Sequence, residues 1–269
     1  MKVRILHFSD THKAAGLETG KALLDKRLLG ILNSTVIRRK RYDQSRIAPA
    51  VEYILAEKPD LTLFTGDATS CGQRGEFLRA LKDFKPILES SLPFVYIPGN
   101  HDAYVKDPEC RKALEDFTFA MNREKRTLAE YPFVLEFKFF RLLVIHCARP
   151  VNAYLSCGIM DQETRDFIQA EVRKTDSRPL LCAGHFPILH GSSLWNFRRR
   201  LYGASEIREM LQDHRIALSL CGHIHKPGQI LDAAGRGEIV SGSLTKTGLL
   251  NQITFSPEEK IFSLERITL

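Results

Sequence analysis

Apolar and polar positions alternate along the chain in short blocks, which predicts buried strands separated by amphipathic helices. Short apolar runs rich in Val, Ile, Leu and Phe predict strands at 3–8, 61–65, 92–97, 133–139, 141–146, 179–183 and 216–220. Apolar residues at helical spacing predict helices at 21–33, 45–57, 76–85, 110–130, 161–174 and 205–213. Further strands are expected at 238–243, 251–255 and 260–266. Strands that alternate with helices predict an α/β fold with parallel pairing.

The middle of the chain departs from this alternation. The runs 133–139 and 141–146 are separated by a single residue, which predicts a tight turn and an antiparallel pair. We therefore expect a second group of strands that is antiparallel at least in part. The chain has no internal repeat, low-complexity tract or linker, so we expect a single domain over residues 1–269 with one insertion at about 16–45.

The insertion carries most of the positive charge. Residues 21–46 contain eight Lys and Arg residues against two Asp residues, a local net charge of +6 compared with +7 for the whole chain. Apolar residues at near-helical spacing precede the basic run 38–41, which predicts a basic amphipathic helix. Two interpretations stay open. The helix packs on the domain with its cationic face in solvent, or residues 21–41 cap the substrate or lie on an anionic membrane surface.

Length and composition fit a globular chain. With 269 residues, of which 43% are apolar, the chain can bury a complete core. No apolar stretch reaches the roughly 18 residues of a membrane span, and the N-terminus runs directly into a predicted strand, so we expect no signal peptide. The six cysteines are scattered without a CxxC pair, as in a reduced chain. We expect a cytoplasmic protein, peripheral at the inner face of the membrane if the insertion binds lipid.

Polar side chains of metal-ligand type follow five of the predicted strands. They are Asp10 and His12, Asp67, Asn100 with His101 and Asp102, His185, and His223 with His225. In open α/β sheets, ligands bind at the loops beyond the carboxyl ends of strands. Each loop alone has an ordinary structural explanation, but five together predict one site. Imidazole and carboxylate groups suit Zn²⁺, Mn²⁺ or Fe, and these ligands exceed the need of one ion, so we expect two divalent ions that share a carboxylate.

Arginines in two other loops are candidate substrate contacts. Arg149 follows the strand 141–146, and Arg198 and Arg199 belong to a run of three arginines. Because a guanidinium can bind phosphate through two hydrogen bonds, these residues either contact a substrate phosphate or form a solvated cationic surface. His146, at the end of its strand, either lines the cleft or makes an ordinary hydrogen bond.

The order and spacing of these residues resemble the motif set of the calcineurin-like metallophosphoesterases, across nearly the whole chain. The matching residues are Asp10-x-His12, Gly66-Asp67 with Gly72, Gly99-Asn100-His101-Asp102, His185 and Gly222-His223-x-His225. The resemblance implies a four-layer α-β-β-α sandwich of two mixed sheets flanked by helices. It implies one ion on Asp10, His12, Asp67 and His225, and a second ion on Asp67, Asn100, His185 and His223. It also implies that His101 donates a proton to the leaving group and that Asp102 orients His101.

The resemblance also narrows the expected reaction. An Asp after Gly-Asn-His is more typical of phosphodiesterases and nucleases than of Ser/Thr protein phosphatases. Residues 69–72 and 185–187 resemble the branch of cyclic-nucleotide phosphodiesterases and lipid A pyrophosphohydrolases, although His146-Cys147 departs from the Asp-Ser usual there. We expect hydrolysis of a phosphodiester or pyrophosphate bond, in which a hydroxide shared by two ions attacks phosphorus in line and His101 protonates the leaving oxygen.

Several substrates stay open at this point. A cyclic nucleotide is the leading expectation, and a lipid-linked nucleotide of the UDP-2,3-diacylglucosamine type is the alternative. A nuclease is a weaker alternative, because the cationic segments lack interleaved aromatic residues. A metal-binding scaffold without catalysis is the remaining one, although every ligand position carries a suitable residue.

Overall fold

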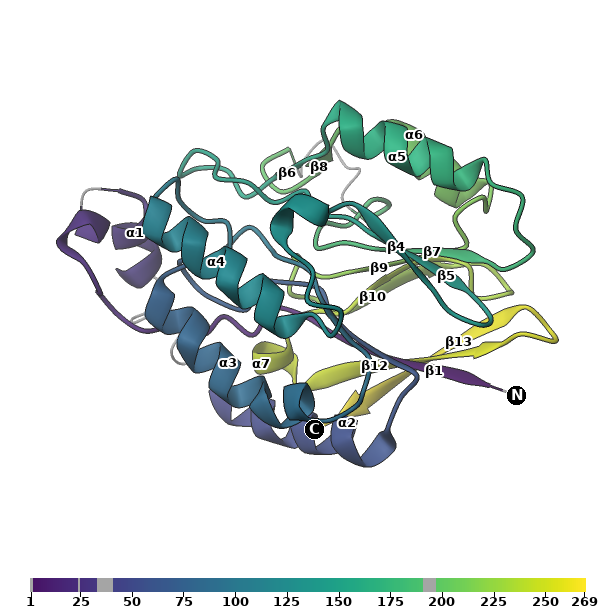
Figure 1. The fold of residues 1–269 in the computed structure, drawn as a ribbon, viewed down its shortest axis with the longest axis horizontal. Helices are drawn as coiled ribbons and strands as arrows, with labels where there is room; N and C mark the ends of the chain where they lie inside the picture. The colour runs from purple at the N-terminus through teal and green to yellow at the C-terminus, as the bar shows by residue number, and fades with distance from the viewer. Residues whose placement is uncertain (1, 24, 33–40, 191–196) are drawn as a thin grey trace.

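The computed structural model describes residues 2–23, 25–32, 41–190 and 197–269, and its strands form two mixed sheets with helices outside them (Figure 1). The five-stranded sheet has the order β13-β12-β1-β2-β3. Its members are β1 (Val3–Phe8), β2 (Leu61–Phe64), β3 (Phe94–Tyr96), β12 (Leu249–Ser256) and β13 (Ile261–Thr268). β1, β2 and β3 are parallel, whereas β12 pairs antiparallel with β1 and with β13.

The six-stranded sheet has the order β10-β11-β9-β7-β5-β4. Its members are β4 (Phe133–Glu136), β5 (Arg141–Val144), β7 (Leu180–Ala183), β9 (Leu218–Cys221), β10 (Gly228–Leu231) and β11 (Gly237–Val240). The four central strands are parallel, and the outer strands β4 and β10 pair antiparallel with their neighbours. β4 and β5 confirm the predicted antiparallel pair. The sequence pattern missed β10, which is only partly buried, and the two-residue strands β6 (Gly158–Ile159) and β8 (Leu201–Tyr202).

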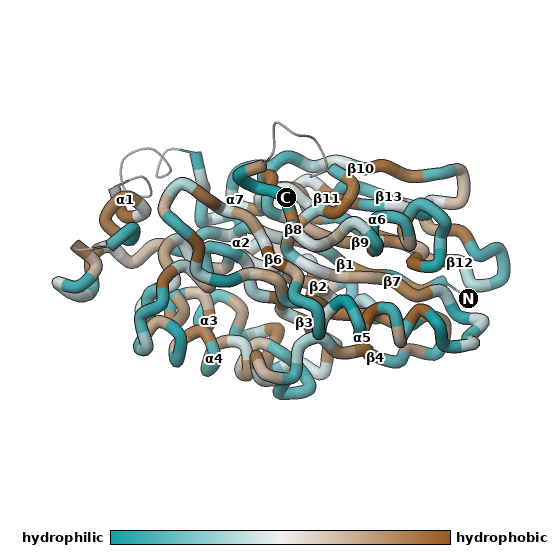
Figure 2. The backbone as a smooth tube through the Cα atoms, turned by 90° about the horizontal axis from the view of Figure 1, so that it is seen from above, coloured by the Kyte–Doolittle hydropathy of each residue, from teal (hydrophilic) through white to brown (hydrophobic). Residues whose placement is uncertain are grey.

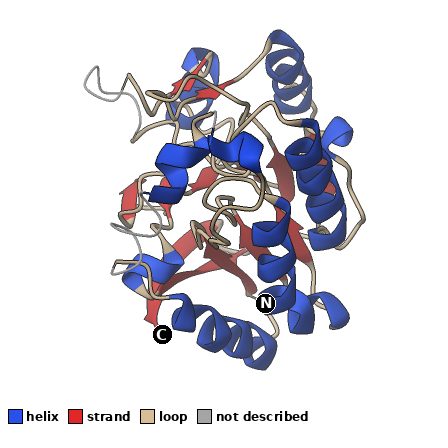
Figure 3. Ribbon diagram, turned by 90° about the vertical axis from the view of Figure 1, so that its left-hand side faces the viewer, coloured by secondary structure: helices blue, strands red, loops and turns tan. Residues whose placement is uncertain are grey.

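Helices cover the outer face of each sheet. On the side of the five-stranded sheet lie α2 (Ile47–Glu57), α3 (Arg74–Glu89) and α4 (Pro108–Met121) (Figure 1). On the side of the six-stranded sheet lie α5 (Gln162–Val172) and α6 (Ser205–Gln212). Figure 3 shows the strands in the interior with helices around them, and the layers follow the expected α-β-β-α order. Within the described ranges, no helix has both the length and the apolar character needed to cross a membrane.

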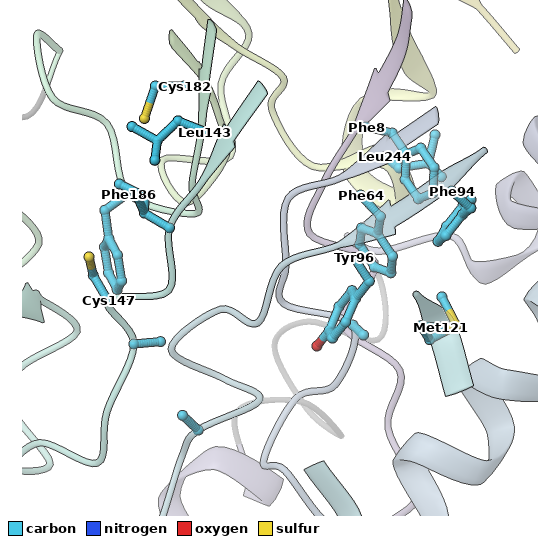
Figure 4. Close-up of a cluster of buried hydrophobic side chains, with 14 of the residues drawn as sticks. Phe8, Phe64, Phe94, Tyr96, Met121, Leu143, Cys147, Cys182, Phe186 and Leu244 are labelled. Carbon is cyan, nitrogen blue, oxygen red and sulfur yellow. The ribbon is translucent and has the colours of Figure 1, made fainter. Parts of the chain in front are cut away.

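Alternating side chains along the strands build two hydrophobic cores. On β1, Ile5 belongs to the core between the sheets, and Phe8 belongs to the core that faces the helices. Phe8 stacks on Phe64 with ring centroids 4.6 Å apart, and Figure 4 shows both rings near Tyr96. Strands buried on both faces form continuous apolar runs, which explains why the hydrophobic pattern predicted them. These packed strands hold the loops at their carboxyl ends in place.

The helix expected over 110–130 is shorter in the structure. α4 ends at Met121 because the side chain of Asn122 binds two backbone groups. Its oxygen accepts a hydrogen bond from the N–H of Tyr96 at 3.0 Å, and its nitrogen donates to the carbonyl of Thr118 at 2.9 Å. These bonds tie the helix end to β3, and the chain turns there before the short helix η4 (Leu128–Glu130).

In its described residues, the insertion is helical in short pieces. In place of the continuous helix expected over 21–33, it contains η1 (Gly20–Leu23), α1 (Arg27–Leu32) and η3 (Gln44–Arg46). The break precedes Arg27, whose backbone N–H and guanidinium both donate to the carboxylate of Asp25 at 2.8 Å. A carboxylate before a helix binds the first free N–H groups, so α1 begins here. Residues 38–40 of the predicted basic run lie outside the described residues.

Candidate metal centre and active site

Loops at the carboxyl ends of five strands bring the candidate ligands to one place. The loops follow β1, β2, β3, β7 and β9, and they carry Asp10 with His12, Asp67, Asn100 with His101, His185, and His223 with His225. β1, β2 and β3 are parallel in one sheet, and β7 and β9 are parallel in the other, so in each sheet the carboxyl ends of these strands lie along one edge. Of the seven predicted metal ligands, all except His225 are buried.

The ligand loops are tightly wound. Left-handed backbone conformations occur at five of the candidate ligands, with φ of 58° at Asp10, 49° at His12, 53° at Asp67, 72° at His223 and 56° at His225. Such a conformation costs a non-glycine residue about 1–3 kcal/mol, and strain of this kind clusters at functional sites. Backbone hydrogen bonds between the loops maintain it, as where the N–H of His12 donates to the carbonyl of Asp67 at 2.9 Å.

Glycine lets these loops approach each other closely. A Cβ atom on Gly222 would lie 2.6 Å from Oδ2 of Asp10. The N–H of His223 uses this space to donate to Oδ2 of Asp10 at 3.0 Å. Similarly, the N–H of His101 donates to Oδ1 of Asp67 at 2.7 Å. Each carboxylate thus binds a neighbouring backbone through one oxygen and keeps the other, Oδ1 of Asp10 and Oδ2 of Asp67, for a ligand.

The first ligand group consists of Asp10, His12, Asp67 and His225, whose ligand atoms all lie within 4.8 Å of one another. Oδ1 of Asp10 lies 3.1 Å from Nε2 of His225 and 3.6 Å from Nε2 of His12. The two imidazole nitrogens are 2.9 Å apart. These are the residues expected to hold one of the two ions.

The second ligand group consists of Asp67, His185 and His223, so that Asp67 belongs to both groups. Nε2 of His185 lies 3.4 Å from Oδ2 of Asp67. The same nitrogen lies 3.2 Å from Oδ1 of Asn100, which adds an amide oxygen to the group. The structure therefore brings all the predicted ligands into two adjoining groups with a shared carboxylate.

The donor atoms of both groups fit divalent metal ions. Among the described residues, Oδ1 of Asp10, Oδ2 of Asp67 and Nε2 of His223 are buried and have no hydrogen-bond partner. Because buried polar atoms are nearly always hydrogen-bonded, three such atoms in adjoining groups indicate that their lone pairs serve a cation. Carboxylate, amide and imidazole donors together are typical of sites for Zn²⁺, Mn²⁺ and Fe.

Hydrogen bonds on the outer side of two imidazoles select the nitrogen that faces the site. Nδ1 of His185 lies 2.6 Å from the carbonyl oxygen of Thr65, and Nδ1 of His12 lies 3.3 Å from that of Thr69. A carbonyl oxygen only accepts hydrogen bonds, so Nδ1 carries the hydrogen in both residues. Nε2 then presents its lone pair to a metal ion.

Charges within the cluster shift the pKa values of its members. Burial alone would raise the pKa of Asp67, but the imidazoles of His185 and His101 hold it well below its ordinary range. Burial would lower the pKa of His185, but the Asp67 carboxylate raises it to about 9. Burial and the nearby charge of His185 lower the pKa of His223 to about 3. Neighbouring imidazoles thus stabilise the charge of the buried Asp67 carboxylate, a role that a bound cation would take over.

His101 and Asp102 have separate structural roles. Nδ1 of His101 lies 2.6 Å from the carbonyl oxygen of Ser70, which orients the ring. The carboxylate of Asp102 instead accepts hydrogen bonds from the N–H groups of Gly99 (2.9 Å) and Thr69 (2.9 Å). Burial and the charge of Asp67 raise the pKa of Asp102 to about 6. We expected Asp102 to orient the His101 ring, but its carboxylate ties two ligand loops together and a backbone carbonyl orients the ring.

A cleft of about 270 Å³ opens over the two ligand groups. Its walls contain Asp67, Asn100, His101, His223 and His225, together with Arg41, Tyr42, Ser156, Arg199, Ile224 and Lys246. Sequence reasoning missed Tyr42, Ser156 and Lys246 as site residues, and no motif surrounds them. The sequence pointed to Arg41 only through the basic run 38–41 of the insertion, to which it belongs.

The three arginines expected to contact substrate have different positions. Arg199 lines the cleft. Arg149 forms an ion pair with Asp161 at 2.9 Å, and Nε of Arg198 donates to the carbonyl of Tyr154. Neither of these two lines the cleft, so the structure does not support them as substrate contacts.

His146 also lies outside the cleft walls. Burial lowers the pKa of its imidazole to about 4, and its ring packs edge-on against Tyr131 with centroids 5.7 Å apart. Its Nδ1 has no hydrogen-bond partner among the described residues, but a hydrogen bond to the backbone of Pro98 opposes the fall of its pKa, so the ordinary hydrogen bond that the sequence suggested is present.

The fold and this arrangement of ligands have a known counterpart. The sequence model of the calcineurin-like phosphoesterases matches residues 3–227. The chain therefore belongs to the calcineurin-like phosphoesterase family, as its motifs suggested.

Individual proteins that resemble this chain share little sequence identity with it. A probable glycerophosphodiester phosphodiesterase, GpdQ, from Arcobacter nitrofigilis is 26% identical over 174 residues, which cover 64% of this chain and 59% of the relative. The chain thus aligns with less than two thirds of that relative's length. Among solved structures, a dimetal phosphatase from Danio rerio shares the fold with a TM-score of 0.65 at 15% identity, covering 99% of this chain and 98% of that one. A purple acid phosphatase from yellow lupin, Lupinus luteus, has a TM-score of 0.59 at 12% identity, covering 100% of this chain and 54% of that one.

Proposed function

We propose that this protein is a two-metal phosphodiesterase in which residues 1–269 act as one catalytic domain. The observation that carries the proposal is the sharing of the buried Asp67 by two adjoining ligand groups, on a cleft that His101 also lines. Family membership supports a phosphoesterase. The name of the Arcobacter relative supports a diester as the substrate.

Two divalent ions of Mn, Fe or Zn would occupy the two groups. The residues that would hold them are Asp10, His12, Asp67 and His225 for one, and Asp67, Asn100, His185 and His223 for the other. When bound, such ions lower the pKa of a water molecule and neutralise charge on the phosphoryl oxygens of an in-line displacement.

The chain's own residues position the substrate and move a proton. Nδ1 of His101 lies 2.6 Å from the carbonyl oxygen of Ser70, so a proton that His101 gives to a substrate in the cleft would come from Nε2. An imidazolium there can protonate the leaving oxygen. Asp102 holds the loop that carries His101 through its bonds to Gly99 and Thr69. This arrangement keeps the proton donor at a constant place beside the ligand groups.

Hydrolysis of bis-p-nitrophenyl phosphate with added Mn²⁺ tests the proposal. We expect Asp67→Asn and His101→Ala to lose at least 100-fold in kcat/KM, since each removes a group that acts on the reacting atoms. Asp116→Asn, on the exposed face of α4, and His214→Ala, whose imidazole lies beside Asp232 and does not line the cleft, are matched controls. Activity of Asp67→Asn or His101→Ala equal to the wild type would contradict the mechanism.

The identity of the diester is open to a direct comparison. A panel of 3′,5′- and 2′,3′-cyclic nucleotides, UDP-2,3-diacylglucosamine, glycerophosphodiesters and a single-stranded oligonucleotide would rank the substrate classes. We propose a small diester, because the cleft of about 270 Å³ is slightly smaller than the roughly 300–1,000 Å³ of typical small-molecule sites. Preferred cleavage of the oligonucleotide would favour the nuclease alternative.

We also propose that the insertion contacts an anionic membrane surface. Leu17, Leu23 and Leu29 are 50%, 49% and 60% exposed, beside the basic Lys21. Figure 2 shows α1 as a largely hydrophobic segment at one end of the molecule. Exposed leucines among lysines and arginines are typical of elements that lie on anionic lipid.

Co-sedimentation with phosphatidylglycerol vesicles tests this contact. The double variant Leu23→Ser with Leu29→Ser is expected to lose binding. Leu78→Ser, at a 51% exposed leucine on α3, is the control. Two outcomes would contradict the proposed membrane contact. One is equal sedimentation of the wild type with neutral and anionic vesicles, and the other is binding of the double variant equal to that of the wild type.

A further inference from the structure

Three cations from distant segments line the same cleft as the candidate metal ligands. They are Arg41 at the end of the insertion, Arg199 in the turn before β8, and Lys246 in α7 (Leu244–Thr247). All three are exposed to solvent. None of them forms an ion pair with a carboxylate in the described part of the chain.

Some arginines outside the cleft are paired within the chain. Arg27 pairs with Asp25 at 2.8 Å, and Arg149 pairs with Asp161 at 2.9 Å. Such pairs balance charge within the chain. The positive charge of the three cleft cations is left for a ligand, because an unbalanced cationic cleft attracts anions.

Hydrogen bonds hold two of the cations beside the ligand loops. The N–H of Asp43 donates to the carbonyl of Thr245 at 2.8 Å, which joins the segments that carry Arg41 and Lys246. The side-chain amide of the following residue, Gln44, donates to the carbonyl of Thr11 at 2.9 Å. These two segments therefore form one wall of the cleft, anchored to the loop between Asp10 and His12.

α7 is anchored to the same loop. The hydroxyl of Ser243 caps α7 and donates to the carbonyl of Asp10 at 2.7 Å. Arg199 belongs to a different part of the cleft lining, where the N–H of Ser156 donates to the carbonyl of Arg198 at 2.9 Å. The cations thus come from separately anchored segments of one cleft.

A singly charged phosphodiester does not require these cations. Two divalent ions held by Asp10 and Asp67 would by themselves retain positive charge for the phosphoryl group that reacts. Three more cations on the same cleft match a substrate with a second negative group close to the first. Guanidinium and ammonium groups are the side chains that bind phosphoryl oxygens.

We propose that Arg41, Arg199 and Lys246 form a subsite for a second phosphoryl group, adjacent to the one that is cleaved. The inference rests on the proposed phosphodiesterase function and narrows its substrate to a diester of diphosphate, as in nucleoside diphosphate esters. In the reaction, the oxygen of water bonds to one phosphorus and the bond from that phosphorus to the bridging oxygen breaks. The bridging oxygen leaves with the bonding electron pair and takes up a proton. One water and one diphosphate diester give two phosphomonoesters.

Two substrates that differ in one phosphoryl group test the subsite. The ratio of kcat/KM for UDP-glucose to that for the p-nitrophenyl ester of thymidine 5′-monophosphate is measured in the wild type and in Arg41→Gln, Arg199→Gln and Lys246→Gln. We expect each substitution to lower this ratio about tenfold, which corresponds to about 1.4 kcal/mol, because each removes a charge-assisted hydrogen bond to the second phosphoryl group. Arg149→Gln is the control, since Arg149 is paired outside the cleft and should leave the ratio at the wild-type value.

A binding measurement gives a readout that needs no turnover. Calorimetric titration of the chelator-treated protein compares methylenediphosphonate with methylphosphonate. Tighter binding of the diphosphonate in the wild type, reduced about tenfold in each cleft variant, supports the subsite.

The outcomes separate this inference from the proposed function. A wild type that hydrolyses neither substrate with any divalent ion would contradict the phosphodiesterase itself. Hydrolysis with a substrate ratio unaffected by all three substitutions would overturn the subsite alone. If the three substitutions lowered kcat/KM for p-nitrophenyl phosphate as much as for UDP-glucose, the cations would bind the terminal dianion of a phosphomonoester. That result would also overturn the subsite. Preferred cleavage of an oligonucleotide would assign them to a polymer backbone, with the same consequence.

Discussion

The hydroxyl oxygen of Tyr42 lies 2.7 Å from Nδ1 of His225. Tyr42 comes from the end of the insertion, and His225 is a candidate ligand from a loop far along the chain. The Tyr42 ring also packs edge-on against His12, another ligand of the same group, with centroids 5.3 Å apart. Backbone carbonyls orient His12 and His185, whereas a side chain of the insertion orients His225. The insertion thus contributes directly to the first ligand group.

Tyr42→Phe is expected to weaken metal binding. The substitution removes the hydroxyl that accepts a hydrogen bond from Nδ1–H of His225. The imidazole then loses the contact that orients it toward Asp10. Removing such a partner of a metal-bound histidine typically lowers metal affinity 10–100-fold. Calorimetric titration with Mn²⁺ and the absorption spectrum of the Co²⁺ form measure the effect. Tyr53→Phe, whose hydroxyl approaches Gln252 on another part of the surface, is the matched control. Wild-type affinity and spectrum in Tyr42→Phe would show that the contact has no role in metal binding.

Gly222→Ala is expected to disrupt the first ligand group. The new Cβ would lie 2.6 Å from Oδ2 of Asp10, so the loop that carries His223 must shift. We expect weaker metal binding and a loss of about 1–3 kcal/mol in the free energy of unfolding, as for other overpacked sites. Metal titration and urea unfolding test this. Gly20→Ala, with open space around its position, should affect neither quantity. A Gly222→Ala protein with unaltered metal affinity would contradict the geometry.

Metal removal is expected to lower thermal stability. Asp10 and Asp67 are buried carboxylates with unpartnered oxygens, so a bound cation stabilises the folded state over the unfolded chain. At 100 times the dissociation constant the gain is about 2.7 kcal/mol for one site. Melting curves with EDTA and with Mn²⁺ should differ in the wild type. The difference should nearly vanish in Asp67→Asn, which alters both groups, and persist in Asp116→Asn. An equal shift in both variants would mean that the ion binds elsewhere.

The buried Glu76 is expected to make stability depend on pH. Burial, opposed by hydrogen bonds from the N–H groups of Cys71 and Gln73, raises the pKa of Glu76 to about 8. The folded state holds this proton more tightly than the unfolded chain, so the protein loses stability as the pH rises from the ordinary carboxyl pKa to about 8. Urea unfolding at several pH values should show a smaller loss in Glu76→Gln than in the wild type. Equal pH dependence in both proteins would contradict the raised pKa.

The strands and the metal ligands could be predicted because each has a local signal. A strand buried on both faces is a continuous apolar run, and Asp67, His185 and His223 each stand directly after such a run, next to a glycine. Because the carboxyl ends of parallel strands lie at the same edge of a sheet, these residues come together as soon as the strands pair. The pattern failed where burial is partial, as in β10, or where one side chain stops a helix, as Asn122 does at the end of α4.

Local sequence therefore determined which residue types stand at the strand ends, and with them the two ligand groups. Only the tertiary structure decided that Tyr42 reaches His225, that Lys246 and Arg199 line the cleft, and that Arg149 does not. Arg149 follows β5 and Arg199 stands in a run of three arginines, and nothing near them in sequence shows which of them lines the cleft. The difference arises because Asp161, folded beside Arg149, neutralises its charge, whereas no carboxylate of the described chain pairs with Arg199. Pairings between distant segments depend on how the whole chain packs, and no local pattern encodes them.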